Sequence, residues 1–244
     1  MADFAAARRW LADAERVAVL TGAGISHESG VPTFRGPGGL WRQYRPEDLA
    51  TPEAFARDPR LVWEWYDWRR SLVAQAAPNA GHRALVELEQ RAREFTLITQ
   101  NVDGLHDRAG SRRLLKLHGD LWTLRCLGCG AEREDRAVPL AELPPRCPCG
   151  GLLRPGVVWF GEPLPAEVLR VAMEAAAQAQ VFLVVGTSAV VQPAASLPLV
   201  ARRAGARVIE INAEPTPLSD VVDASFLGKS GELLPRLVEA GVRQ

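Results

Sequence analysis

The chain has 244 residues, of which 47% are hydrophobic and 24% charged, and this size suits one large globular domain or one domain with an insertion. Its 29 basic and 29 acidic residues cancel, so the net charge gives no indication of a nucleic-acid partner. No uncharged apolar run reaches the roughly 18 residues of a membrane-spanning helix, and the initial MADFAAARRW lacks the apolar stretch of a secretory signal. We therefore expect a cytoplasmic protein without a membrane partner.

The first predicted element is a short apolar strand that ends in glycines, within RVAVLTGAGIS at 16–26. Gly22 and Gly24 would allow backbone amides to approach a pyrophosphate. The third glycine of the dinucleotide-binding fingerprint is missing, however. A tight strand-to-helix turn would use the same two glycines, so this motif alone leaves both interpretations open.

An aromatic, helical segment at 36–79 follows and interrupts the pattern of apolar strands. In its sequence WEWYDWRRS, helical spacing puts Tyr66 and Arg69 on one face, in a row that is otherwise apolar, and turns Arg70 outward. An arginine in an apolar row needs a carboxylate, a phosphate or a route to solvent. The pattern therefore indicates either a pocket for an anion or an arginine that reaches solvent over a tryptophan-rich core.

A second predicted strand, at 95–101, ends in a cluster of polar side chains. Gln100, Asn101 and Asp103 are close together in TQNVDGLH. At the end of a strand they would hold a ribose, a carboxamide or a water molecule. The alternative is a turn capped by Asn101 and Asp103, since both residue types favour such local hydrogen bonds.

The sequence KLHGD contains the histidine best placed to act as a base. His118 follows the apolar LLKL, which would be a strand that ends at the same crevice. Histidine is the side chain best able to accept a proton near neutral pH. A single histidine is also often structural, and His27, His82 and His106 are ambiguous in the same way.

The segment at 123–156 has little periodicity, several prolines and all four cysteines of the chain. They form two close pairs, Cys126 with Cys129 and Cys147 with Cys149. Four thiolates on such loops suit a tetrahedral, structural zinc ion with no open position for water. The single residue within the second pair strains this geometry slightly, and four reduced core cysteines are the alternative.

The remaining elements repeat the design of the first. Helical segments are predicted at 80–93, 164–179 and 193–204, and further apolar strands at 181–188 and 207–214. Strands that alternate with helices predict an α/β fold with a parallel sheet covered on both faces. Ligands bind beyond the carboxyl ends of such strands, so the polar and glycine-rich strand ends are expected to meet at one crevice.

This pattern predicts a Rossmann-like core with an inserted smaller domain. The core would comprise 1–35, 80–122 and 157–244. The inserted domain would combine the helical segment 36–79 with the zinc module 123–156.

Taken together, these motifs resemble one family, the sirtuins, which are NAD-dependent protein-lysine deacylases. The segments that carry the resemblance run in family order: GAGISHESGVPTFRG (22–36), TQNVDGLHDRAGS (99–111), LHGDLW (117–122), the two cysteine pairs, LLRPGVVWFGE (152–162), VVGTSAVVQPA (184–194) and INAE (211–214). The resemblance implies a larger Rossmann-like domain, a smaller zinc-and-helix domain, and a cleft between them where NAD meets an acyl-lysine peptide. NAD is then a co-substrate, and one structural Zn²⁺ is expected per chain.

The resemblance also implies which residues contact the ligands. Those expected along NAD are Gly22, Ala23, Gly24, Ile25, Ser26, Phe34 and Arg35. Those expected around its nicotinamide ribose are Gln100, Asn101, Val102 and Asp103, and those expected at its adenosine half are Gly186, Thr187, Ser188, Asn212, Ala213, Glu214 and Ser230. The substrate peptide is expected to pair as an added strand with Val157, Val158, Trp159, Phe160, Gly161 and Glu162.

The chemistry implied by the resemblance gives His118 a role. His118 would remove a proton from a ribose hydroxyl, while Asn101 and Asp103 orient the ribose and the water. The products would be nicotinamide, free lysine and 2′-O-acyl-ADP-ribose. A protein ADP-ribosyltransferase on the same scaffold, and a non-catalytic module that binds NAD or acyl-lysine, are the alternatives.

One part of the resemblance concerns the acyl group. The spacing of Tyr66 and Arg69, with Thr33 in place of the commoner aspartate and the small Ala50, resembles the sirtuin class that removes succinyl, malonyl or glutaryl groups. In that class the tyrosine hydroxyl and the guanidinium bind the distal carboxylate, and the alanine leaves room for it. Arginine suits such two-pronged recognition.

Overall fold

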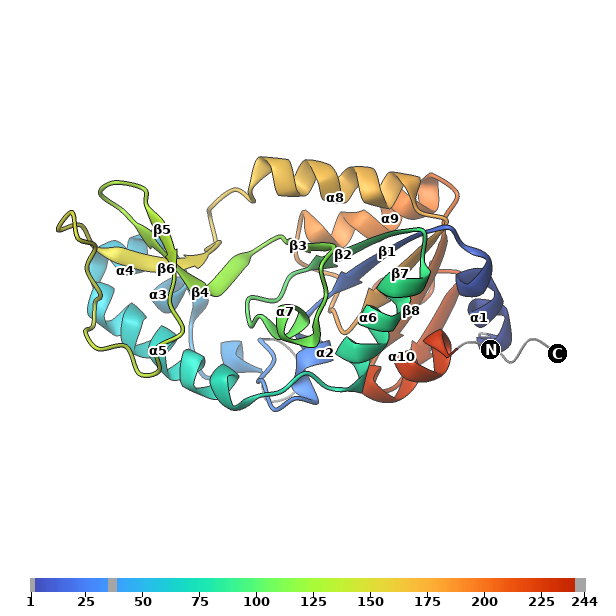
Figure 1. The fold of residues 1–244 in the computed structure, drawn as a ribbon, viewed down its shortest axis with the longest axis horizontal. Helices are drawn as coiled ribbons and strands as arrows, with labels where there is room; N and C mark the ends of the chain where they lie inside the picture. The colour runs from blue at the N-terminus through green and yellow to red at the C-terminus, as the bar shows by residue number, and fades with distance from the viewer. Residues whose placement is uncertain (1–2, 35–38, 240–244) are drawn as a thin grey trace.

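Six parallel strands form the main sheet of the computed structural model, which describes residues 3–34 and 39–239 (Figure 1). The strands are arranged in the order β3-β2-β1-β7-β8-β9. Their bounds are β1 (Arg16–Thr21), β2 (Glu94–Thr99), β3 (Leu114–Lys116), β7 (Val181–Val185), β8 (Arg207–Asn212) and β9 (Ala224–Leu227). The strand order changes direction between β1 and β7, and this is the point where open α/β sheets bind nucleotides.

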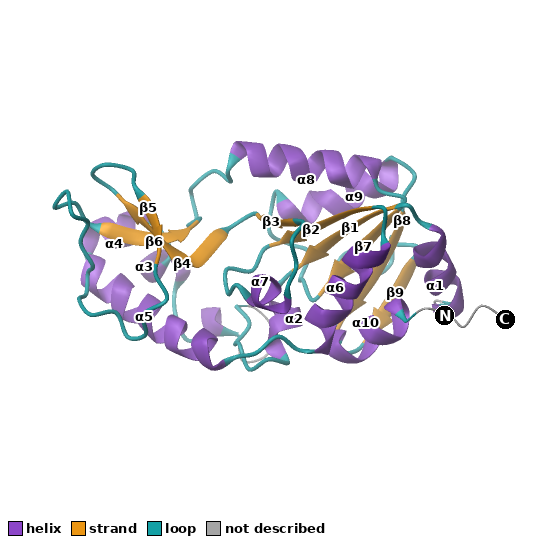
Figure 2. Cartoon of the chain, viewed as in Figure 1, coloured by secondary structure: helices purple, strands orange, loops and turns teal. Residues whose placement is uncertain are grey.

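Helices cover both faces of this sheet (Figure 2). One face carries α1 (Phe4–Asp13), α6 (Ala80–Arg91) and α10 (Ser230–Val238), and the other carries α8 (Ala166–Gln178) and α9 (Leu197–Arg203). Alternate residues of β1 explain this arrangement, since Val17 and Val19 pack into the first face while Ala18 and Leu20 pack into the second. The strand is therefore apolar throughout, as expected for a sheet buried on both sides.

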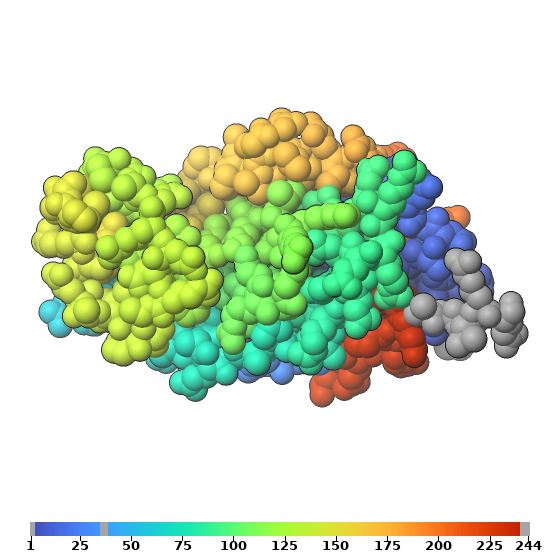
Figure 3. All heavy atoms as spheres, viewed as in Figure 1, coloured from blue at the N-terminus to red at the C-terminus, as the bar shows by residue number. Residues whose placement is uncertain are grey.

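A smaller module lies at one end of the elongated molecule, and Figure 3 shows it as a separate lobe. Its antiparallel sheet contains β4 (Gly119–Cys126), β5 (Glu132–Glu134) and β6 (Leu153–Val157). The helices α3 (Pro46–Leu49), α4 (Pro52–Arg57) and α5 (Pro59–Gln75) pack with this sheet around a core rich in aromatic side chains. Trp63 of α5 is fully buried there, and its Nε1 donates to the carbonyl oxygen of Leu153 at 2.8 Å.

The short helices α2 (Ala23–His27) and α7 (Leu105–Ala109) complete the main body, following β1 and β2 respectively. Single 3₁₀ turns lie at Leu40–Arg42 and Ala194–Ser196. Local capping fixes where α6 begins, because the Asn79 side chain accepts from the backbone N–H of Gly81 and the His82 ring accepts from the N–H of Asn79.

The predicted α/β fold with a parallel sheet is confirmed, and so is the strand predicted before His118, which is β3. The sequence pattern did not predict α1, α10 or β9. It also did not predict the three strands of the small sheet, where the short length of β5 and the proline in β6 obscure any alternation. Across residues 3–34 and 39–239, none of the helices combines the length and the apolar character needed to cross a bilayer.

Candidate active site

Glycines allow the loop after β1 and the loop after β7 to approach each other closely at the carboxyl ends of these strands. The N–H of Gly24 donates to the carbonyl oxygen of Gly186 at 2.7 Å, and the N–H of Gly22 donates to that of Val185 at 3.0 Å. A Cβ on Gly24 would lie 2.7 Å from Gly186, and one on Gly186 would lie 2.4 Å from the nitrogen of Ile25. Gly186 also has a φ of +60°, which favours glycine. These loops therefore present bare backbone at the switch point of the sheet.

A chain of directed hydrogen bonds lies next to the glycines. Asn101 Nδ2 donates to the carbonyl oxygen of Gly22 at 3.0 Å and to Ser26 Oγ at 3.2 Å. Ser26 Oγ donates in turn to Asp103 Oδ2 at 2.8 Å, and the N–H of Leu105 donates to Asp103 Oδ1 at 2.8 Å. Burial raises the pKa of Asp103, and the hydrogen bonds from Leu105 and Ser26 oppose this effect. The network fixes an amide and a carboxyl group in one orientation, as recognition of a sugar hydroxyl or a water molecule requires.

His118 is half-buried at the same strand ends and is held by one hydrogen bond. Its Nδ1 lies 2.9 Å from the carbonyl oxygen of Gln100. Because a carbonyl oxygen only accepts, Nδ1 carries the proton of the neutral ring, and Nε2 keeps a lone pair. Burial lowers the pKa of His118 below its ordinary value of 6.5, and the bond to Gln100 opposes this effect. The imidazole is therefore neutral at pH 7 and able to accept a proton through Nε2.

The side chain of Gln100 connects two strand ends across the site. Its Nε2 donates to Thr187 Oγ1 at 2.9 Å and to the carbonyl oxygen of Thr21 at 3.3 Å. The ends of β1, β2 and β7 are thus held together by one amide. The same residue that orients His118 therefore also fixes the loop after β7.

Two further histidines lie behind this site and support it. The rings of His82 and His106 are 4.8 Å apart, and burial lowers the pKa of His82 to about 4 and that of His106 well below its ordinary value. The backbone N–H of Asn79 donates to Nδ1 of His82, so the proton of this ring is on Nε2, 3.5 Å from Ser26 Oγ. His82 thus continues the chain through Ser26 to Asp103. The role of His82 was not predicted. The one signal in the sequence is its place at the third position of a helix capped by Asn79.

Tyr66 and Arg69 lie in a cluster of aromatic side chains in the small module. The guanidinium carbon of Arg69 lies 4.4 Å from the ring centroid of Phe34 and 5.3 Å from that of Trp65. Arg69 is only 3% exposed, and burial lowers its pKa to about 10, although Tyr66 and Asp103 oppose this effect. Burial raises the pKa of Tyr66 to about 12, so its hydroxyl keeps its proton. A positively charged group and a neutral hydroxyl therefore share this cluster.

The expectation that Arg70 faces outward is wrong. Its side chain is 0% exposed, and Nη2 donates to the Asp135 carboxylate at 3.0 Å. The other bonds of its guanidinium go to the carbonyl oxygens of Leu121, Asp135 and Ala137. Strand β4 and the loop after β5 cover this side of α5, which helical periodicity alone did not reveal. Arg70 thus supports the module, and Arg69 is the arginine that lies among the aromatic side chains.

The segment expected to pair with a peptide follows β6. Within it, the N–H of Val158 donates to the carbonyl oxygen of His118 at 2.9 Å, and that of Phe160 donates to the carbonyl oxygen of Ala50 at 2.9 Å. The N–H of Trp159 is used too, since it donates to Glu162 Oε2 at 2.8 Å. Two carbonyl groups of the segment are engaged as well, because that of Trp159 accepts from the N–H of Glu162 and that of Val157 accepts from Arg154. The same bonds bring this segment next to His118 and Ala50.

The four cysteines come together at the tip of the small module. Their sulfur atoms all lie within 4.8 Å of one another. The individual contacts are 3.5 Å between Cys126 and Cys149 and 3.8 Å between Cys129 and Cys147. Four thiol sulfurs at these separations fit one tetrahedral zinc ion, and the short second pair does not prevent their convergence.

The residues expected at the adenosine half come from three separate loops. Thr187 is buried next to the glycines, whereas Ser188, Ala213 and Glu214 are exposed or nearly so. Asn212 Nδ2 donates to the carbonyl oxygen of Glu214 at 2.8 Å and closes its own loop. Ser230 is buried at the start of α10, near Gly81 of α6. The expected NAD contact Arg35 lies outside the described residues.

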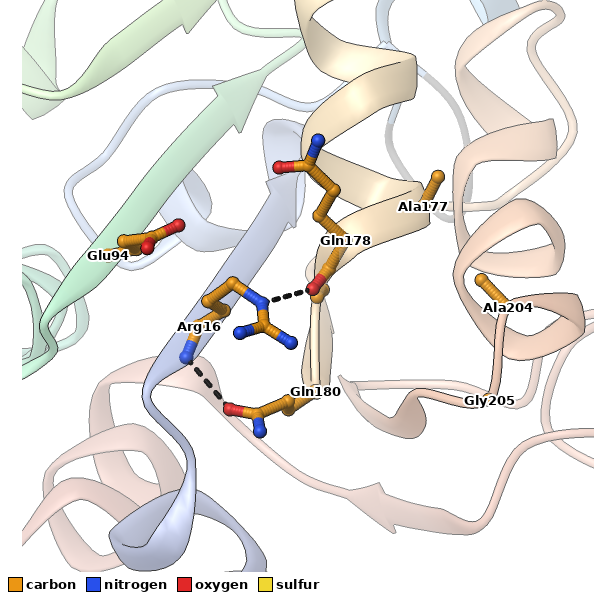
Figure 4. A pocket seen from close by; sticks show the side chains of 8 residues that line it. Arg16, Glu94, Ala177, Gln178, Gln180, Ala204 and Gly205 are labelled. Atoms are coloured by element: carbon orange, nitrogen blue, oxygen red, sulfur yellow. Dashed lines mark hydrogen bonds between the residues drawn. The ribbon is translucent and has the colours of Figure 1, made fainter.

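A surface pocket of about 530 Å³ lies at the opposite, amino-terminal end of the strands (Figure 4). Two of its polar side chains are already paired, since Arg16 Nε donates to the carbonyl oxygen of Gln178 and the backbone N–H of Arg16 donates to Gln180 Oε1. None of the predicted site residues lines it. The chemical groups of the chain thus gather at the carboxyl ends of the strands instead.

Comparison with known proteins agrees with this geometry. The family model described as Sir2 family matches residues 22–193. The chain is 57% identical over 224 residues to an NAD-dependent protein deacylase of Aquifex aeolicus, covering 91% of this chain and 94% of that protein. It is 58% identical over 231 residues to NAD-dependent protein deacylase 2 of Pyrobaculum aerophilum, covering 94% and 92%. A solved Sir2 homologue in complex with ADP-ribose superposes with a TM-score of 0.92 at 52% identity, covering 95% and 93%.

Proposed function

This chain belongs to the Sir2 family and is an NAD-dependent protein deacylase, and from that premise we propose that it removes succinyl, malonyl and glutaryl groups as well as acetyl groups from protein lysines. The products would be nicotinamide, free lysine and 2′-O-acyl-ADP-ribose. The single observation that carries the acyl preference is the buried guanidinium of Arg69 beside the Tyr66 hydroxyl.

The nucleotide would bind at the switch point of the main sheet. Gly22, Gly24 and Gly186 allow the loops after β1 and β7 to pack backbone against backbone, because a Cβ on any of them would collide with the opposite loop. A pyrophosphate would bind at these glycine-rich strand ends. The loops after β7 and β8, with Ser230, would hold the adenosine half. Gln100, Asn101 and Asp103 would surround the nicotinamide ribose, with Val102 between them. In domain terms, the Rossmann-like core would bind NAD and the inserted module would cover the acyl-lysine.

His118 would act as the general base. Its Nε2 is the free nitrogen, and its depressed pKa keeps it neutral at pH 7, so it would accept a proton from a ribose hydroxyl. Asn101 would then orient the ribose through its fixed amide. Asp103, held by Ser26 and Leu105, would orient the sugar or the attacking water.

The acyl chain would extend from the cleft into the aromatic cluster. Ala50 is buried and small, and its carbonyl oxygen bonds to the N–H of Phe160 in the segment proposed to hold the peptide. Arg69 and Tyr66 would then bind a carboxylate at the distal end of the acyl chain. A buried cation that has no carboxylate partner among the described residues is costly, and a carboxylate-bearing substrate would remove that cost.

The peptide itself would align along Val157–Glu162. The Arg154–Glu162 ion pair, with Arg154 stacked 3.5 Å from the Trp159 ring centroid, holds the shape of this segment. Backbone pairing tolerates many sequences, so we expect loose sequence preference. When bound, a structural zinc ion would tie the loop of Cys126 and Cys129 to that of Cys147 and Cys149.

One assay tests this proposal directly. Acetyl-, succinyl- and glutaryl-lysine versions of one peptide would be incubated with the enzyme and NAD, and the products identified by mass spectrometry. We expect deacylation of all three, with 2′-O-acyl-ADP-ribose formed in step with free lysine. Release of acetyl alone would refute the acyl preference, and ADP-ribosylated protein in place of O-acyl-ADP-ribose would refute the deacylase chemistry.

A further inference from the structure

Three buried hydrogen-bond donors of α5 lack a partner among the described residues: Trp65 Nε1, Arg69 Nη1 and Arg70 Nε. The other guanidinium nitrogens of Arg70 are paired with Asp135 and backbone carbonyls, and the two donors considered below, on Trp65 and Arg69, lie one helical turn apart. Among the described residues, neither Trp65 Nε1 nor Arg69 Nη1 has a hydrogen-bond partner. Trp65 is 7% exposed and Arg69 is 3% exposed, so solvent does not satisfy either donor. Buried donors are paired in the great majority of native structures, and each exception calls for an explanation.

Other buried tryptophans of the same region make the exception clear. Nε1 of Trp63 donates to the carbonyl oxygen of Leu153 at 2.8 Å, and Nε1 of Trp122 donates to that of Asp103 at 2.8 Å. Nε1 of Trp159 donates to the hydroxyl oxygen of Tyr66 at 2.9 Å. The surroundings of Trp65 supply aromatic faces in place of acceptors. Its ring stacks on Trp41 at 5.8 Å between centroids and meets the Tyr66 ring edge-on at 4.8 Å.

Together, Trp65, Tyr66 and Arg69 offer an unusual set of donors. The Tyr66 hydroxyl accepts from Trp159, so its own proton is available to another acceptor. The guanidinium of Arg69 lies 5.3 Å from the Trp65 ring centroid, which places all three groups in one small space. An indole N–H, a phenol O–H and a guanidinium therefore lie in one aromatic cluster, where Asp103 is near enough to influence the pKa of Arg69 but no described carboxylate forms an ion pair with it.

A carboxylate is the group that matches this set. It is planar, carries a negative charge, and accepts about four hydrogen bonds through two oxygens. We propose that Trp65 Nε1 is a third donor to the distal carboxylate of the acyl group, next to Arg69 and Tyr66, and so a further residue that determines acyl specificity. This inference rests on the proposed acyl preference and adds to it a residue that the Tyr-x-x-Arg pattern does not contain. An acetyl group is too short to present an acceptor to Trp65.

The variant Trp65→Phe tests the inference, because it removes the N–H and keeps an aromatic ring. The measurement is the ratio of kcat/KM for a succinyl-lysine peptide to kcat/KM for the acetyl-lysine version. A hydrogen bond to a charged group corresponds to a fall in this ratio of about 10-fold to 100-fold. The melting temperature of Trp65→Phe is expected to stay the same or to rise, because the substitution removes no hydrogen bond between described residues. A succinamoyl-lysine peptide, with a neutral carboxamide in place of the carboxylate, should be a poor substrate of the unchanged enzyme.

Trp63→Phe and Trp68→Phe are the matched controls on the same helix. Trp63→Phe loses the bond to Leu153 and should lower the melting temperature without changing the ratio. Trp68 is 37% exposed, and Trp68→Phe should change neither quantity.

The possible failures are distinguishable. A normal ratio in Trp65→Phe, together with loss of desuccinylation in Arg69→Met, would overturn the role of Trp65 and leave the proposed function standing. Equal losses of both activities with a lower melting temperature would show that Trp65 only packs. If the unchanged enzyme does not release succinyl groups at all, the proposed acyl preference itself is wrong, and this inference fails with it.

Discussion

The carbonyl oxygen of Gln100 lies 2.9 Å from Nδ1 of His118 and so determines which nitrogen of that ring is free. The same Gln100 side chain binds Thr187 at the end of β7. One residue thus links the orientation of the base to the loop that would hold the nucleotide. Replacement of His118 should therefore affect the turnover rate without affecting the affinity for NAD.

Replacing His118 should abolish turnover while NAD still binds. General-base catalysis contributes about 10²-fold to 10⁴-fold, so His118→Tyr and His118→Ala should lose roughly that much in kcat. The dissociation constant for NAD, measured by calorimetry, should change little, because the glycines and the polar strand ends are untouched. Turnover close to that of the unchanged enzyme in both variants would remove His118 from the mechanism.

As the pH is lowered, kcat/KM should fall only at a pH below 6.5, the ordinary pKa of histidine. The base must be neutral, so activity is present above the pKa of His118 and is lost as the pH falls through it. Burial lowers this pKa below 6.5, which moves the loss to lower pH. A profile of kcat/KM against pH checks this expectation. A midpoint above 6.5, or an identical midpoint in the residual activity of His118→Ala, would contradict it.

Arg69→Met should remove desuccinylation selectively. Truncating one partner of a buried, hydrogen-bonded charge pair costs about 2–5 kcal/mol, which corresponds to roughly 30-fold to several thousand-fold in kcat/KM for the succinyl peptide. Deacetylation should fall far less, because an acetyl group has no distal carboxylate. Kinetics on the two peptides give the ratio. Equal losses would assign Arg69 to the fold alone.

Arg70→Met is the matched control one position along the chain. Arg70 pairs with Asp135 inside the module, so its loss should lower the free energy of unfolding by about 3–5 kcal/mol. The succinyl-to-acetyl ratio should stay constant in whatever fraction remains folded. Thermal unfolding, followed by activity normalised to folded protein, measures both quantities. A selective change in the ratio would mean that the two arginines have been assigned the wrong way round.

Removing the metal should destabilise the small module. The sulfur atoms of Cys126, Cys129, Cys147 and Cys149 lie within 4.8 Å of one another, so a bound ion would tie the two cysteine loops together. Elemental analysis should find one zinc per chain, and a chelator or Cys149→Ser should lower the melting temperature. A full complement of zinc in Cys149→Ser, or a melting temperature insensitive to chelation, would argue that the cysteines are simply reduced thiols.

The parts of the fold that could be predicted are the strands whose residue pattern is found in only one kind of structural environment. Strands β1, β2, β7 and β8 are buried on both faces, so their apolar runs are continuous and easily recognised. Their ends carry the glycines and polar residues, and the parallel topology brings these ends to one edge. This is why the sequence alone predicts that Gly22, Asn101 and Gly186 lie close together.

The parts that could not be predicted depend on contacts between distant segments. Arg70 and Asp135 are 65 residues apart, and nothing in the helical pattern of α5 reveals that β4 and the loop after β5 cover that side. The unpaired Nε1 of Trp65 is invisible for the same reason, since a sequence lists donors without their acceptors. The engaged N–H groups of the segment after β6 likewise appear only when Ala50 and His118 are brought beside it.

Strand β4 runs directly from the residue after His118 to Cys126, and it pairs with β6 from Gly119–Val157 at one end to Cys126–Leu153 at the other. The pairing is irregular between Asp120 and Leu124, and the strand links the cysteine cluster at one end to the segment of His118 at the other. Disturbing the cysteine cluster would therefore be expected to move His118, the proposed base, without any chemical change at the proposed active site. Oxidation of these cysteines would therefore lower the turnover rate, although the cysteines themselves contact neither substrate.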